Sequence, residues 1–255
     1  MAIYHLSVKS ISRSAGRSVV AAAAYRAGQE LTDERQGMTH DYTRKQGVED
    51  AFIVAPSGAD WAQDRNALWN AAEAAEKRKD AKTGREYELA LPAELDAGAR
   101  KELARDFARE LVKRYGVVAD VAIHEPGREG DNRNHHAHIL TTTRTAGVDG
   151  LGAKTRVLDV ASTASAEIEH MRGVWARQVN TALERHQVEQ RVDHRSFERQ
   201  RKELARQAEI RRQQDIRAAE EARKAAEKDR QKQLAKEIEE PTFRRSRDRG
   251  PSIGF

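Results

Sequence analysis

The sequence predicts an α/β (α+β) domain in which five strands alternate with four helices, followed by a long charged helix. Residues 2–9 and 85–91 alternate apolar and polar side chains, and this period of two is typical of a half-buried strand. Residues 61–79 and 162–186 instead repeat large apolar side chains at helical spacing. After Phe197, apolar residues become sparse and charged residues dominate.

The first half of the chain begins with a strand and a helix. An alanine run favours a helix over residues 17–29, with Ser14 or Ser18 as its N-cap. Tyr25 therefore lies on a helix, four residues after Ala21 and on the same face. The elements expected in this half are strands at 2–9, 51–55 and 85–91 and helices at 17–29 and 61–79.

The second half contains a predicted β-hairpin between two helices. Asp96 is placed to cap a helix that ends at Gly116. Strands at 117–125 and 136–143 follow, joined by a connection rich in Gly, Asn and Arg. The fourth helix, over 162–186, has an apolar stripe that faces a core.

Composition divides the chain into three predicted regions. The whole formal net charge of +5 lies in residues 196–255, which hold 17 basic and 12 acidic side chains. The preceding residues hold equal numbers of basic and acidic side chains. Apolar residues in 198–240 show no sustained heptad, so this segment is expected to be a single charged helix rather than a coiled coil. We predict a folded domain over 1–197, a charged helical extension over 198–240 and a basic disordered tail over 241–255.

Amino-acid usage excludes several classes of site. The chain has no cysteine, so disulfides and thiolate metal sites are excluded, and any metal requires nitrogen or oxygen ligands. It contains neither a signal-peptide pattern nor an apolar run of about 18 residues. We therefore expect no membrane insertion and a soluble, cytoplasmic protein.

Positive charge is concentrated at the start of the chain. Lys9, Arg13, Arg17 and Arg26 precede the first acidic residue, Glu30, and serines lie among them. Such side chains suit phosphate oxygens, so these four are candidate DNA-binding residues. The alternative is a solvated patch without a ligand.

Three of the nine histidines have the spacing of a metal site. His136 and His138 are two residues apart in a predicted strand, so both side chains leave the same face. His124 ends the preceding strand, and a hairpin would bring it opposite His136. Three neutral imidazoles suit a divalent transition metal, whereas His135 is one residue out of register and points away.

The chemistry of such a site stays open at this point. It could be hydrolytic, structural, or able to polarise a phosphate for a protein nucleophile. Tyr25 taken alone is more often a packing residue, since a tyrosine hydroxyl is a weak nucleophile at neutral pH. Glu86 and Glu88 point to one face of their strand, and either could orient a histidine.

Several segments in order resemble the MobA/MobL relaxases, plasmid mobilisation nucleases of the MobQ type within the HUH endonuclease class. The resemblance covers about residues 1–200 and is specific because the motifs recur at family-like separations. The motifs are MAIYHL at 1–6, AYRAG at 24–28, YELALP at 87–92, AIH at 122–124, NHHAHIL at 134–140 and VDHRS at 192–196.

This resemblance implies that Tyr25 attacks the scissile phosphate at a plasmid transfer origin. The attack leaves a 5′-phosphotyrosyl link and a free 3′-hydroxyl, and reversal rejoins the strand after transfer. His124, His136 and His138 match the ligands of a divalent metal, Mg²⁺ or Mn²⁺. Glu88 matches an acidic residue near the site, and we rank it above Glu86. Relatives often carry Pro or Tyr where this chain has His135, which leaves a swapped ligand open.

The resemblance also implies a fold and partners. The fold is an antiparallel sheet of about five strands with helices on one face and the histidines on central strands. The expected partners are single-stranded or supercoiled plasmid DNA and, by analogy, relaxosome accessory proteins and a type IV secretion coupling protein. The charged extension is expected to be a linker, a partner-binding arm or a solvated helix.

Three other interpretations compete with mobilisation. A rolling-circle replication initiator uses the same histidine and tyrosine chemistry on a different origin. A metal-stabilised single-strand-binding module without catalysis would leave Tyr25 as a packing residue. A charged helical scaffold explains the extension but not the histidine spacing.

Overall fold

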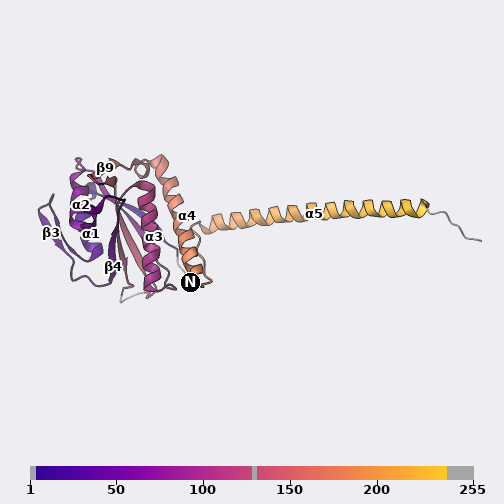
Figure 1. Ribbon diagram of the computed structural model, residues 1–255, viewed down its shortest axis with the longest axis horizontal. Helices are drawn as coiled ribbons and strands as arrows, with labels where there is room; N and C mark the ends of the chain where they lie inside the picture. Colours follow the sequence, from indigo (N-terminus) through magenta and orange to yellow (C-terminus); the bar gives the residue numbers. More distant parts are fainter. Residues whose placement is uncertain (1–3, 128–130, 240–255) are drawn as a thin grey trace, which may run out of the picture. The chain divides into compact units, whose positions relative to one another are not determined.

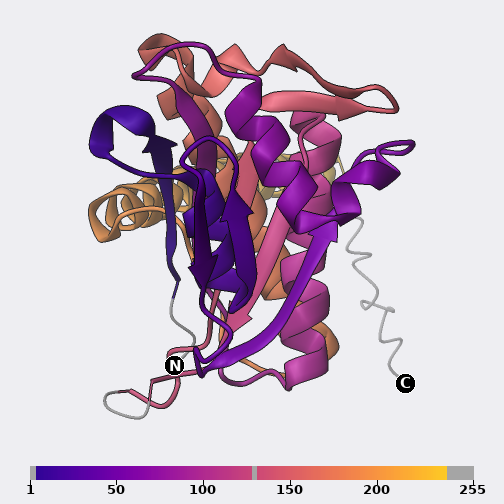
Figure 2. The same cartoon turned by 90° about the vertical axis from the view of Figure 1, so that its left-hand side faces the viewer.

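A five-stranded antiparallel sheet forms the centre of the protein (Figures 1 and 2). The structure, a computed structural model, describes residues 4–127 and 131–239. Every neighbouring pair of strands is antiparallel, which confirms the predicted sheet. In spatial order the strands are β1 (Leu6–Ser12), β5 (Lys82–Ala90), β7 (His136–Thr142), β6 (Ala119–His124) and β4 (Val48–Val54).

Two small hairpins accompany the sheet and were not predicted. One pairs β2 (Glu30–Asp33) with β3 (Met38–Asp41), and the other pairs β8 (Arg144–Gly147) with β9 (Gly150–Lys154). Their strands have four or five residues, too few for a period of two to stand out in the sequence.

Four helices cover the sheet on both faces, whereas the family resemblance implied one face only. The face opposite the histidines packs against α3 (Ala97–Tyr115) and α4 (Ala161–Arg185). The face with the histidines packs against α1 (Val19–Ala27) and α2 (Arg65–Ala74). The physical reason lies in the strands, which are apolar on both sides: in β7, Ile139 joins the first core and Leu140 the second.

Local signals set where these helices begin and end. The Ser18 side chain accepts a hydrogen bond from the Ala21 amide and caps α1, and Asp96 caps α3 in the same way. α1 ends at Gly28, whose φ of 62° is a left-handed conformation that glycine adopts without strain. Asp64 caps α2, so this helix begins later than predicted, and Trp61 lies in a short 3₁₀ helix before it.

The last helix, α5 (Phe197–Glu239), is charged and nearly all its described side chains are exposed, as the sequence predicted. Contacts divide the chain into two units, Met1–His194 and Arg195–Phe255. The tail predicted over 241–255 lies outside the described residues. The division into a folded domain, a charged extension and a tail stays a prediction. None of the helices described is long and apolar enough to span a membrane.

A buried ion pair holds α2 to the sheet. Arg65 donates two hydrogen bonds of 2.8 Å to Asp120 on β6, and the Trp69 indole donates another of 2.8 Å to the same carboxylate. Both charged side chains are buried, at 9% and 4% exposure. These hydrogen bonds compensate for the burial of the Asp120 carboxylate. Loss of any one partner would therefore leave a buried polar or charged group without its hydrogen bond.

We expect Asp120→Ala to lower the free energy of unfolding by about 3–5 kcal/mol, because it leaves the Arg65 charge buried without its carboxylate. Urea unfolding followed by circular dichroism measures this loss. The control is Asp106→Ala, which removes the exposed pair with Arg109 on α3 and should cost about 0.5 kcal/mol or less. Equal losses in the two variants would contradict the role of the buried pair.

Candidate active site

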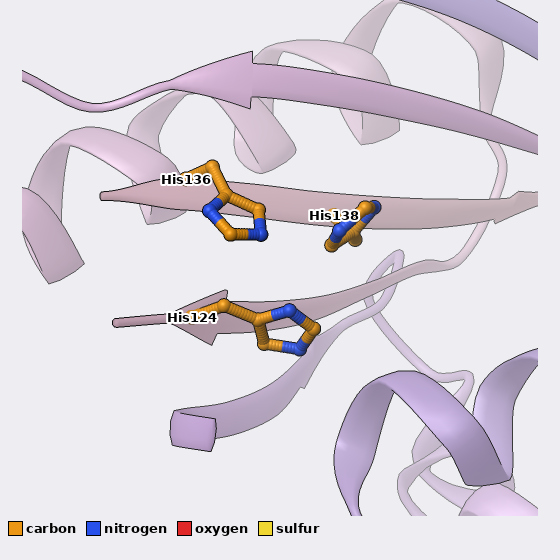
Figure 3. A group of neighbouring side chains, drawn as sticks. All are labelled: His124, His136 and His138. Atoms are coloured by element: carbon orange, nitrogen blue, oxygen red, sulfur yellow. The ribbon is translucent and has the colours of Figure 1, made fainter. Parts of the chain in front are cut away.

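Three histidines converge on one face of the sheet (Figure 3). The register of β6 and β7 pairs His124 with His136, and His138 lies two residues further along β7 on the same face. The ring centroids are 5.2 Å apart for His124 and His136, 4.9 Å for His124 and His138, and 5.2 Å for His136 and His138. One nitrogen from each ring lies within 4.8 Å of the others, so the rings can share one metal ion.

Each ring is oriented by a hydrogen bond through its other nitrogen. His136 Nδ1 is 2.9 Å from the Asn134 carbonyl oxygen, and His124 Nε2 is 2.8 Å from the Arg26 carbonyl oxygen. His138 Nδ1 is 2.6 Å from a carboxylate oxygen of Glu86. Because these oxygens accept, each bonded nitrogen carries the proton in the neutral ring. The lone pairs left are on His136 Nε2, His138 Nε2 and His124 Nδ1.

Burial keeps two of these rings in the form that binds metal. It lowers the pKa of His124 to about 4, opposed by the hydrogen bond to Arg26 and helped by the charge of Lys45. Burial also lowers the pKa of His136. Both rings are therefore neutral at pH 7, and a metal ion need not displace protons from them.

The carboxylate that contacts the cluster is Glu86, although the sequence ranking placed Glu88 first. Glu86 is 3% exposed and receives hydrogen bonds from both His138 and Arg26. Burial raises the pKa of Glu86, but those two hydrogen bonds outweigh it and hold the pKa at about 2. Glu88 instead accepts a 2.8 Å bond from Lys9, so the histidine-orienting role belongs to Glu86.

Tyr25 lines the same cavity as His138, one histidine of the cluster. The cavity has a volume of about 440 Å³, and its lining includes Tyr25, His138, Glu86 and Glu88. Ala21 lines it as well, in agreement with its predicted shared helical face with Tyr25, and so does Arg17, which precedes α1. Tyr25 is 49% exposed, which is unusual for a packing tyrosine. The cavity thus brings the exposed Tyr25 side chain together with one histidine of the cluster.

Lys45 contacts Tyr25 twice and was missed by the sequence reasoning. Its ammonium lies 3.8 Å from the centre of the Tyr25 ring and donates a 2.8 Å hydrogen bond to the Tyr25 carbonyl oxygen. Tyr42 packs edge-on against the same ring, with centroids 5.2 Å apart. Burial lowers the pKa of Lys45 to about 8, with a further contribution from Arg26. In sequence Lys45 is one cation in a polar connection, and only the fold brings it to Tyr25.

The four candidate DNA-binding residues differ in how free their charges are. Arg13 donates four hydrogen bonds, to the Glu73 carboxylate and to three backbone carbonyls, and forms an ion pair with Glu73. These contacts hold Arg13 within the fold, so its predicted phosphate contact is not supported. Arg26 pairs with Glu86, and Lys9 pairs with Glu88. Arg17 is exposed, and no partner is found for it within residues 4–127 and 131–239.

His135 does not belong to the cluster. Its backbone carbonyl accepts a 2.8 Å hydrogen bond from Leu91, and the metal-binding group found among the described residues contains only the three histidines predicted. The exchange of ligands left open by the sequence is therefore not supported by the geometry.

Residues 17–221 match the sequence profile of the MobA/MobL family, four-fifths of the chain. The chain belongs to the MobA/MobL family. The resemblance predicted from the ordered motifs is thereby confirmed.

Two curated relatives show how much of the longer MobA/MobL proteins this chain matches. The mobilization protein MobL of Acidithiobacillus ferridurans is 47% identical over an alignment of 222 positions, which covers 77% of this chain and 58% of that protein. The conjugal transfer protein TraA of Rhizobium radiobacter is 34% identical over an alignment of 229 positions, which covers 78% of this chain and 20% of that protein. The chain therefore spans little more than half of the first relative and a fifth of the second.

Solved structures share the fold. A structure described as the molecular basis of vancomycin resistance transfer in Staphylococcus aureus is 29% identical, with a TM-score of 0.67, and covers 77% of this chain and all of its own. The conjugative relaxase TrwC, solved with a mutant oriT DNA, has a TM-score of 0.50 at 14% identity over 74% of this chain and 72% of its own. At that identity the second comparison supports the fold alone.

We expect Glu86→Gln to weaken Mn²⁺ binding by about 10-fold to 100-fold, because it removes the charge that orients His138 and raises its basicity. The matched control, Glu88→Gln, alters a neighbouring carboxylate on the same strand and should leave the affinity nearly unchanged. Isothermal titration calorimetry on the full chain measures both. Equal effects, or a larger effect at Glu88, would return the orienting role to Glu88.

Proposed function

We propose that the protein is a DNA relaxase that nicks one strand at a plasmid transfer origin and later rejoins it. The observation that carries this proposal is the cavity lined by both Tyr25 and His138, one of the three clustered histidines. Membership of the MobA/MobL family supports it, as do relatives named for mobilization and conjugal transfer. DNA at the origin is then the substrate, as single strand or supercoiled plasmid.

In the proposed reaction the Tyr25 hydroxyl oxygen attacks the scissile phosphorus. A tyrosyl P–O bond forms as the bond from phosphorus to the 3′-oxygen breaks, and the phenol proton is balanced by the proton gained at the new 3′-hydroxyl. One ester replaces another, so reversal rejoins the strand without ATP. Lys45 contacts Tyr25 and would supply positive charge beside the phosphate, whereas the charge of Arg26 is paired with Glu86.

The histidine cluster fits a divalent ion because three lone pairs converge and each ring is oriented by its own hydrogen bond. His124, His136 and His138 would hold the ion, and it would act as a Lewis acid on the phosphate. Of the two ions considered, Mn²⁺ suits imidazole nitrogen better than Mg²⁺, which prefers oxygen ligands. Glu86 would act on the ion through His138 rather than bind it.

Competing functions are weighed by the same observations. A rolling-circle initiator would require similar chemistry, and the family membership favours mobilisation over it. A binding module without catalysis gives no reason for a half-exposed tyrosine held by Lys45 in the histidine cavity. Relaxosome proteins and a secretion coupling protein are proposed partners by analogy with the relatives named for conjugal transfer.

A covalent adduct tests the proposal directly. Full-length protein is incubated with supercoiled plasmids carrying candidate origins and with Mn²⁺ or Mg²⁺, and denaturing gels with mass spectrometry identify DNA attached to Tyr25. We expect an adduct that requires metal, disappears in Tyr25→Phe and weakens in His136→Ala. A bound origin that yields no adduct would refute the nucleophile and favour the non-catalytic module.

Lys45 should affect the chemical step more than DNA binding, because it contacts the nucleophile itself. We expect Lys45→Met to slow single-turnover cleavage about 10-fold, as a cation–π contact is worth about 0.5–2 kcal/mol, while the Kd for DNA changes less. Lys45→Arg keeps a cation over the ring and should recover part of the rate. A change in Kd with an unchanged cleavage rate would show that Lys45 serves binding alone.

A further inference from the structure

A second cavity adjoins the one that contains Tyr25. Its volume is about 400 Å³, and it shares Gly16 and Arg17 with the Tyr25 cavity, so the two are neighbours across the turn before α1. Its seven lining residues include five cations and no acid: Arg13, Gly16, Arg17, Arg35, Gln36, Lys77 and Lys79. We call it the basic cavity.

Most of this positive charge is not neutralised by the fold. The buried carboxylate of Glu73 pairs with Arg13 and with the Nε of Arg35. Arg35 is still 37% exposed, and its two terminal nitrogens have no partner among the contacts of the described part of the chain. Lys77 and Lys79 are exposed, and the same part of the chain provides no partner for either of them or for Arg17.

We infer that the basic cavity binds the phosphodiester backbone of the single DNA strand that continues from the scissile phosphate at Tyr25. This inference rests on the proposed function and extends it to a second binding site. Arg17 lines both cavities, so a strand leaving Tyr25 past Arg17 enters a lining that holds five cations and no acid. A polyanion is attracted along such a path at every phosphate.

The lining also indicates which part of the DNA it binds. It contains no aromatic residue on which a base could stack, and its long cationic side chains suit phosphate oxygens. A cavity of about 400 Å³ is the size of a small-ligand site. It can receive the backbone of one strand, whereas a duplex, with a major groove alone about 12 Å wide, is too large to enter it.

The test uses Lys77→Gln combined with Lys79→Gln in the full chain, because neither residue lines the Tyr25 cavity. The matched control, Lys113→Gln with Arg185→Gln, removes two exposed cations from α3 and α4 on the opposite side of the sheet. Fluorescence anisotropy measures binding of oligothymidylates of about five and about twenty nucleotides between 50 and 200 mM salt, with a duplex of the longer length as a third ligand.

We expect the Lys77/Lys79 variant to bind the long strand about 10-fold more weakly at 50 mM salt. Its plot of log affinity against log salt should be shallower by about 1.4, because each phosphate that a lysine neutralises contributes about 0.7 to the slope for single strands and the variant lacks two such lysines. The short strand should bind almost as before, and the control should match the unsubstituted protein on both strands.

Three results would overturn the inference: a slope equal to that of the control, an equal loss on the short strand, or a loss confined to the duplex. The first leaves a solvated patch, the second a general charge effect, and the third a duplex-binding surface. The adduct experiment is separate. If the slope changes but no adduct forms on bound origin DNA, the cavity remains a strand-binding site and the relaxase proposal fails.

Discussion

Arg26 joins the helix that carries Tyr25 to the sheet that carries the histidines. Its guanidinium pairs with Glu86 on β5, and its backbone carbonyl accepts the hydrogen bond from His124 on β6. Glu86 in turn orients His138. One residue next to Tyr25 therefore connects to two of the three histidines, so a shift of α1 would disturb the orientation of the rings and the position of Tyr25 together. Removal of this guanidinium would also leave Glu86 as a buried carboxylate with one partner fewer.

The two faces of the sheet are stabilised differently: buried ion pairs lie on the histidine face, and an apolar core covers the opposite face. On the far face Phe107 and Trp175 meet edge to face in a core built with α3 and α4. That core fixes the strands, while on the near face Asp120, Glu86 and Glu73 are each matched by arginines. The histidine face can therefore bury charged groups while the opposite face packs apolar side chains, since each buried carboxylate has its hydrogen bonds.

The sequence predicted the parts of the site that depend on one strand period. His136 and His138 share a face because they are two residues apart, and the hairpin places His124 opposite His136. The sequence could not show which of Glu86 and Glu88 contacts a histidine, because both lie on one face of β5. That contact depends on the position of Arg26 of α1, which pairs with Glu86. The contacts of Lys45 with Tyr25 and of Arg13 with Glu73 could not be predicted for the same reason, because the two residues of each pair are distant in sequence and meet only in the folded chain.

The contacts of the Tyr25 ring with the Lys45 ammonium and with the Tyr42 ring affect the lifetime of the intermediate in the proposed reaction. A strand in transfer must stay attached for as long as transfer lasts, and a phosphotyrosine on a freely rotating side chain would sample bulk water. A ring contacted by an ammonium on its face and by a second ring at its side has few rotamers open to it. The phosphoryl group would then remain near the histidines, ready for the returning 3′-hydroxyl, and the restraint that aids attack would also protect the link against hydrolysis.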